Sequence, residues 1–88
     1  MRAEAMKAVE TAARGAWAAE TAVAVWAAEV RQRVEVRLGI GMDDPRAWED
    51  PEYASALDTY AELGRARERI EWVLVAMKRE PETAAKEH

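Results

Sequence analysis

The sequence has 88 residues, a formal net charge of −4 and no cysteine. This length allows one domain with a small core. The absence of cysteine excludes a disulfide scaffold and is compatible with a cytoplasmic location. Charged residues occur in short runs of mixed sign, which argues against a nucleic-acid-binding arm. Phenylalanine is absent, so the large apolar side chains are four tryptophans, two tyrosines and scattered aliphatic residues.

The first predicted element is a long helix over residues 3–38, a segment without proline and with a single glycine. Its central stretch, AWAAETAVAVWAAEV at residues 16–30, is apolar around nearly the whole helix. A membrane span requires about 20 apolar residues, so this shorter stretch predicts no span, and Glu20 within it argues against a signal peptide. It instead predicts a helix with neighbours on more than one side.

Apolar residues recur along this helix with alternating three- and four-residue spacing, which is the pattern of a coiled-coil seam. The pattern predicts a seam that faces the second helix and comprises Val9, Ala12, Ala16, Ala19, Val23, Trp26 and Val30, followed by Val34 and Leu38. Gly39 is the expected end of the helix, because glycine readily adopts the left-handed conformation found there.

Two Asp-Pro pairs follow the first helix: Asp44-Pro45 lies within the connection, and Asp50-Pro51 lies where the second helix is expected to begin. Aspartate is a favoured N-cap residue, and proline is favoured at the first helical position because it needs no hydrogen-bond acceptor there. The two pairs predict one short helical turn over residues 45–49 and a second helix over residues 51–79. Residues 1–80 are then a single domain, and residues 81–88 a flexible tail.

The second helix has one apolar side, and the short connection folds it back on the first helix. The predicted fold is therefore an all-α antiparallel helical hairpin. Its expected core comprises Val9, Val23, Trp26, Val30, Val34, Tyr60, Leu63, Gly64, Ile70, Leu74 and Met77.

Arg67 interrupts the apolar side of the second helix, where a charge without a partner is unfavourable. A symmetric connection places Arg67 within one turn of Glu20, which predicts a buried Glu20–Arg67 ion pair. The same register places Gly64 level with Trp26, so the indole ring is predicted to lie over the glycine backbone. The alternative for Gly64 is a position that simply faces solvent.

A hairpin gives the first helix only one neighbour, so its remaining apolar residues predict an association surface. The simplest closed assembly is a homodimer of hairpins, a dimeric four-helix bundle, with a monomer as the alternative. The predicted interface comprises Trp17, Thr21, Ala24, Val25, Ala28 and Trp72.

Residues suited to catalysis or metal binding are few. The single histidine is His88, and the single serine, Ser55, has no histidine near it, so the sequence predicts no enzyme and no metal or cofactor site. The expected function is that of a non-enzymatic, self-associating interaction or scaffold module. One alternative is a subunit of a complex with another protein. A less favoured one is a nucleic-acid-associated regulator that uses Arg31, Arg33, Arg37, Arg65 and Arg69, which alternate with glutamates.

Overall fold

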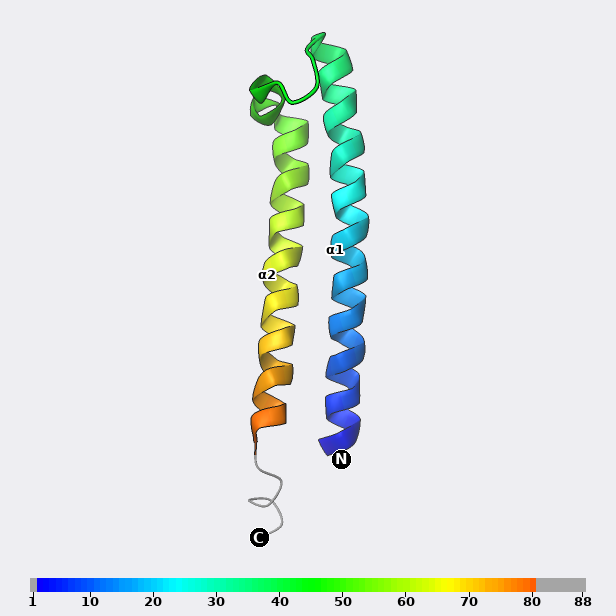
Figure 1. Ribbon diagram of the computed structural model, residues 1–88, viewed down its shortest axis with the longest axis vertical. Coiled ribbons are helices and arrows are strands. Elements are labelled where there is room, and N and C mark those ends of the chain that lie inside the picture. The colour runs from blue at the N-terminus through cyan, green and yellow to red at the C-terminus, as the bar shows by residue number, and fades with distance from the viewer. Residues whose placement is uncertain (1, 81–88) are drawn as a thin grey trace, which may run out of the picture.

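The computed structural model describes residues 2–80, which form two long antiparallel helices joined by a short 3-10 helix (Figure 1). Helix α1 spans Arg2–Leu38, the 3-10 helix η1 spans Pro45–Glu49 and helix α2 spans Pro51–Arg79. The predicted all-α hairpin is confirmed, and each element begins and ends within a residue of its predicted bounds. The predicted tail over residues 81–88, with His88, lies outside the described residues.

Both Asp-Pro pairs begin helices as predicted. The side chain of Asp44 accepts a hydrogen bond from the backbone N–H of Arg46, and that of Asp50 from the backbone N–H of Glu52, each at 3.0 Å. The Arg46 guanidinium also pairs with the Asp44 carboxylate and lowers the pKa of this aspartate to about 2. Asp44 is therefore ionised at neutral pH, which is the form that accepts these hydrogen bonds most strongly.

The loop between α1 and η1 is tied back to the end of α1. Gly39 has a φ of +66°, the left-handed conformation expected where a helix ends. Asp43 also has a φ of 66°, and its backbone N–H donates to the buried Glu35 carboxylate at 3.3 Å. Arg31 lies 3.9 Å from the same carboxylate. Glu35 thus satisfies a loop amide while its own charge is balanced.

The best-packed part of the core lies at the turn end of the hairpin. Val30 and Val34 of α1 are fully buried there, because η1 adds a third element over the two helices. The buried cluster comprises Ala27, Val30, Val34, Ala47, Tyr53 and Ala56, with Ile40 and Leu57 half-buried against it.

The other half of the hairpin has no third element, and its seam is open on both sides. Among residues 2–26 and 57–80, only Ala13 and Glu20 are buried. Arg2 connects the start of α1 to the end of α2. It donates hydrogen bonds to the backbone carbonyls of Met77 and Glu80 and forms an ion pair with the Glu80 carboxylate at 3.1 Å. The described residues form an elongated rod, since α1 alone, with 37 residues, is about 55 Å long.

Ion pairs between the helices define their register. Arg37 lies 3.0 Å from Asp50, and Arg67 lies 2.9 Å from Glu20. The second pair places Arg67 level with Glu20, roughly one helical turn from the position that a symmetric connection predicts. The cause is visible in Figure 1, where η1 sits above the start of α2 while α1 continues upward beside it.

Candidate interaction surface

The side of α1 that faces α2 differs from the predicted seam at every second position. Its buried or half-buried residues include Val9, Ala13, Ala16, Glu20, Val23, Ala27, Val30 and Val34. Ala12, Ala19 and Trp26, which were expected in this seam, are exposed.

Two predictions for the hairpin core are therefore wrong. Trp26 is 43% exposed, and Tyr60 is 40% exposed. Trp26 lies on the flank of the seam because Glu20, which faces Arg67, and the fully buried Val30 set the rotation of α1. Among the other predicted core residues, Val30 and Val34 are buried, whereas the following are half-buried: Val9, Val23, Leu63, Gly64, Ile70, Leu74 and Met77.

The predicted ion pair lies at the middle of the hairpin, within a group that we name the Arg67 cluster: Trp17, Glu20, Arg67 and Glu71. Arg67 donates from Nε to Glu20 at 2.9 Å and from a terminal nitrogen to Glu71 at 2.7 Å. Its guanidinium carbon lies 5.3 Å from the centroid of the Trp17 ring, a cation–π distance. Hydrogen bonds to Glu71 and then Glu20 raise the pKa of Arg67.

Gly64 provides space for this cluster and not for Trp26, so the predicted contact of the Trp26 ring with the glycine backbone is wrong. A Cβ atom at Gly64 would lie 2.9 Å from Oε2 of Glu20 and within 4 Å of no Trp26 atom. The shift in register moves Trp26 about one turn away from Gly64, and the rotation of α1 turns Glu20 toward α2, so that its carboxylate reaches Gly64. The missing side chain lets a buried carboxylate approach α2 closely.

This arrangement predicts an unusual response to Gly64→Ala. Alanine in a helix interior is favoured over glycine by about 1 kcal/mol, but its Cβ atom would displace the Glu20 carboxylate. In the parent, we expect Gly64→Ala to raise the free energy of unfolding by clearly less than about 1 kcal/mol. In the presence of Glu20→Ala, we expect it to raise the free energy of unfolding by the full amount of about 1 kcal/mol. Denaturant midpoints of the four proteins in this cycle provide the measurement. Equal gains in both backgrounds would contradict the role assigned to Gly64.

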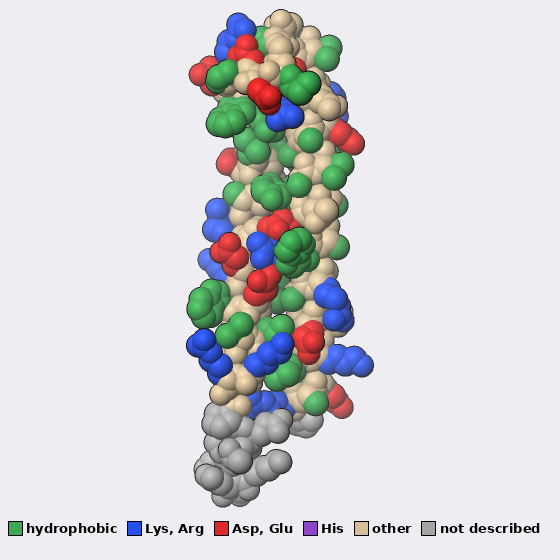
Figure 2. Space-filling view, viewed as in Figure 1, with side chains coloured by type: hydrophobic (Ala, Val, Ile, Leu, Met, Phe, Trp, Pro, Cys, Tyr) green, Lys and Arg blue, Asp and Glu red, His purple; other side chains and the backbone are tan. Residues whose placement is uncertain are grey.

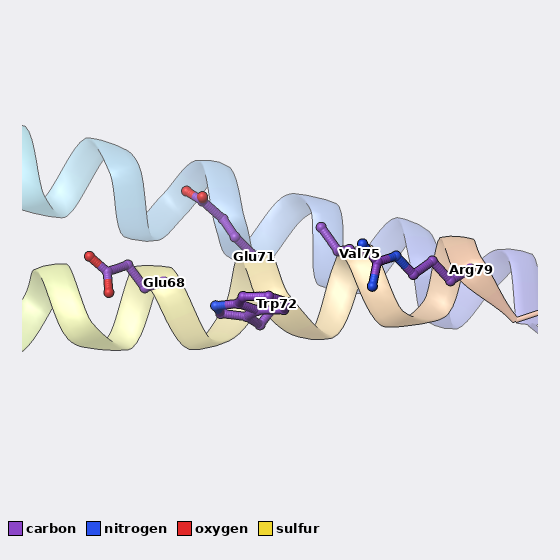
Figure 3. Close-up of a pocket in the computed structure, with 5 residues that line it drawn as sticks. All are labelled: Glu68, Glu71, Trp72, Val75 and Arg79. Carbon is purple, nitrogen blue, oxygen red and sulfur yellow. The ribbon is translucent and has the colours of Figure 1, made fainter.

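The predicted interface residues do not gather on one surface. The Trp17 ring lies against Arg67, although it is 55% exposed. Val25 is 58% exposed on the outer side of α1, with Thr21, Ala24 and Ala28 also exposed. Trp72 is 68% exposed and lines an open groove along α2. In Figure 3 its ring lies over the α2 ribbon, whereas the side chain of Glu71 extends toward α1.

The contacts of Arg67 show which flanks of the two helices share a side of the hairpin. Arg67 touches Trp17 on α1 and Glu71 on α2, so these two flanks lie together. This side also carries Glu10, Arg14 and Lys78 at helical spacing from them, and we name it the charged face. Figure 2 shows acidic, basic and hydrophobic side chains intermixed along one long side of the molecule.

The opposite flank of α1 carries no charged residue between Ala5 and Trp26, whereas on α2 the uncharged Ala66 and Val73 are bordered by Glu62 and Arg69. Helical spacing places Ala12, Ala19 and Trp26 of α1 on the same side as Ala66 and Val73 of α2. Together with the half-buried residues beside them they form a surface that we name the apolar face. It comprises Val9, Ala12, Ala16, Ala19, Val23, Trp26, Leu63, Ala66, Ile70, Val73 and Met77.

The arginines considered for nucleic-acid binding lie near carboxylates. Arg31 lies 3.8 Å from Asp43, Arg33 lies 3.4 Å from Glu52, and Arg37 lies 3.0 Å from Asp50. Arg65 and Arg69 are exposed on α2; Glu62 and Glu68 lie three residues to either side of Arg65, and Glu68 precedes Arg69. Much of the positive charge at the turn end is thus balanced within the chain, which weakens its attraction for phosphate.

Within residues 2–80, no three potential acidic, histidine or cysteine ligands lie together as a metal site. Neither helix in this range contains a segment long and apolar enough to cross a membrane. The chain matches none of the protein-family models, curated sequences and solved structures with which it was compared. The argument for function therefore rests on the surfaces described above.

Proposed function

We propose that the protein is a non-enzymatic helical interaction module that associates with a second copy of itself to form a four-helix bundle. The observation that carries the proposal is the contrast between the two halves of the hairpin. The turn half has a buried core covered by three elements, whereas the open half buries only Ala13 and Glu20 among residues 2–26 and 57–80. Apolar side chains such as Ile70 and Leu74 are half-buried there and gain stability when a partner covers them.

The accessible surface supports the same proposal. Among the described residues, Trp26 is 43% exposed, Val73 is 50% exposed and Trp72 is 68% exposed, so large apolar side chains stay in contact with water along both helices. An extended hairpin that keeps this surface uncovered would be a poor monomer, because burial of apolar surface is the main source of folding stability.

The two alternative functions have less support. A complex with a different protein would cover the same surfaces, but it requires a partner of matching length, whereas a second copy matches by construction. Nucleic-acid binding is disfavoured because Arg31, Arg33 and Arg37 lie beside carboxylates and the chain is acidic overall. A cytoplasmic location remains part of the proposal, since it rests on the absence of cysteine.

Sedimentation equilibrium of the intact chain tests self-association. We expect about twice the chain mass at micromolar concentration, with dissociation on dilution and a melting temperature that rises with protein concentration. A constant monomer mass and a melting temperature independent of concentration would overturn the proposal. If such a monomer bound DNA or RNA in a salt-dependent manner, the nucleic-acid alternative would replace it.

A further inference from the structure

We infer that a second copy of this chain docks on the apolar face, and not on the charged face or on the exposed residues Thr21, Ala24, Val25 and Ala28. This inference rests on the proposed self-association and specifies its surface. It also differs from the interface that the sequence alone suggested, because the rotation of α1 places that interface beside the Arg67 cluster and on the outer side of the helix.

The first argument is that α1 carries two overlapping seams. One seam faces α2 and includes Val9, Ala16 and Val23 together with Ala13, Glu20 and Ala27. The other uses the same three residues with Ala12, Ala19 and Trp26, and it has the alternating three- and four-residue spacing that packs against a helix. In a four-helix bundle each helix contacts two neighbours, and the residues common to both seams point to the centre of the bundle.

The second argument is that α2 repeats this arrangement on the same side of the molecule. Its half-buried residues Leu63, Ile70 and Met77 belong to the seam with α1. With Ala66 and Val73 they form a further apolar seam, of which Val73 is 50% exposed. The register of the hairpin places Val23 level with Leu63 and Ala16 level with Ile70. On each helix, some residues belong both to the seam with the other helix and to the further apolar seam. These shared residues of α1 and α2 therefore meet on the apolar face, which is where the centre of a bundle lies.

The third argument is electrostatic. Docking on the charged face would remove Glu71, whose side chain is 42% exposed, from water, as well as nearby residues such as Glu10 and Arg14. Burial of charges carries a desolvation penalty that their mutual attraction often fails to offset. The members of the apolar face are uncharged, and the charges that border it, Glu62 and Arg69, are exposed and can stay at the rim, so its burial carries a smaller penalty.

The occupant that fits this face is a second copy of the chain. The face is two helices wide and extends along most of the hairpin, so a single foreign helix would leave part of it exposed. A second hairpin covers both helices and supplies identical seams. Small residues at the middle, Ala19 and Ala66, allow the backbones to approach closely. Trp26 and Val73, which are 43% and 50% exposed in the single chain, are the large side chains that such a contact would cover.

Charge substitutions at exposed alanines test the choice of face. Ala66→Glu and Ala19→Glu place a carboxylate on the apolar face, while the matched variants Ala61→Glu and Ala24→Glu place one on the same helices away from this face. All four alanines are exposed in the single chain, so the hairpin itself has space for each change. We expect the first two to raise the dimer dissociation constant by about 100-fold or more, and the second two by less than about 3-fold.

Thiol protection provides a second measurement that adds no charge. Because the chain has no cysteine, Ala19→Cys and Ala24→Cys each introduce a single thiol. The thiol at position 19 should react more slowly with an alkylating reagent as protein concentration rises, whereas that at position 24 should react at a constant rate.

Each outcome bears on a separate claim. A dimeric parent that loses its partner with Ala24→Glu but not with Ala19→Glu would overturn the choice of face and leave self-association intact. The same holds if all four charge variants stay dimeric and neither thiol is protected. A parent that is monomeric at every concentration would overturn both proposals.

Discussion

Val30→Ala should lower the free energy of unfolding by roughly 1.5 kcal/mol. Val30 is fully buried beneath η1, at the only end of the described hairpin where three elements meet. Removing its two methyl groups and leaving a cavity costs about 2 kcal/mol, of which the higher helix propensity of alanine restores roughly 0.5 kcal/mol. In a small domain with little stability, this loss lowers the ratio of folded to unfolded chains by about tenfold.

Val25→Ala is the matched control, because it makes the same chemical change five residues away on the same helix. Val25 is 58% exposed, so its truncation creates no cavity and the propensity of alanine should make the variant slightly more stable. Chemical denaturation of the parent and both variants at one protein concentration measures the difference. Similar losses for both valines would mean that the turn-end core does not dominate stability. A loss confined to Val25→Ala would instead place the outer side of α1 in an interface.

The sequence predicts the elements of this fold well because their boundaries depend on local chemistry. Asp44 and Asp50 each precede a proline, and both cap helices as this pattern indicates. Gly39 ends α1 through its backbone conformation, which neighbouring residues do not need to impose. None of these features requires knowledge of how the helices pack.

The rotation of α1 could not be predicted from periodicity alone. Two apolar seams overlap on this helix, and the one containing Ala12, Ala19 and Trp26 is the more hydrophobic because the other contains Glu20. A pattern of hydrophobicity therefore selects the wrong seam for the contact with α2. The signal that could have corrected it was Glu20 itself, since a predicted ion pair with Arg67 requires Glu20 to face α2.

The register was also inaccurate by roughly one turn, for a reason specific to the connection. A symmetric turn was assumed, but η1 sits above the start of α2 while α1 continues beside it (Figure 1). The Glu20–Arg67 pair was nevertheless found, because the long arginine side chain tolerates an error of that size. The contact of Trp26 with Gly64 was not found, because a ring that packs on a glycine backbone loses the contact when the register changes by one turn.

The ion pair has asymmetric consequences, which a cycle of methionine substitutions should reveal. Arg67→Met should lower the melting temperature more than Glu20→Met does. In Glu20→Met the guanidinium keeps Glu71 at 2.7 Å and the Trp17 ring as neighbours. In Arg67→Met the Glu20 carboxylate, whose side chain is 11% exposed, loses the donor that balances it. A buried charge without a partner is more damaging than the absence of the pair.

The double variant Glu20→Met/Arg67→Met should be more stable than the sum of the single changes implies, and at least as stable as Arg67→Met. Two flexible apolar side chains fill a seam position beside Gly64 and no longer require a charge to be desolvated. Thermal unfolding of the four proteins, at one concentration, gives the coupling between the two positions. Arg65→Met is the control for loss of a positive charge on α2, because Arg65 is exposed, and it should change the melting temperature little. Additive losses in the double variant would show that Glu20 and Arg67 do not stabilise each other. The hairpin register would then depend on the turn-end core and on the contacts of Arg2 and Arg37.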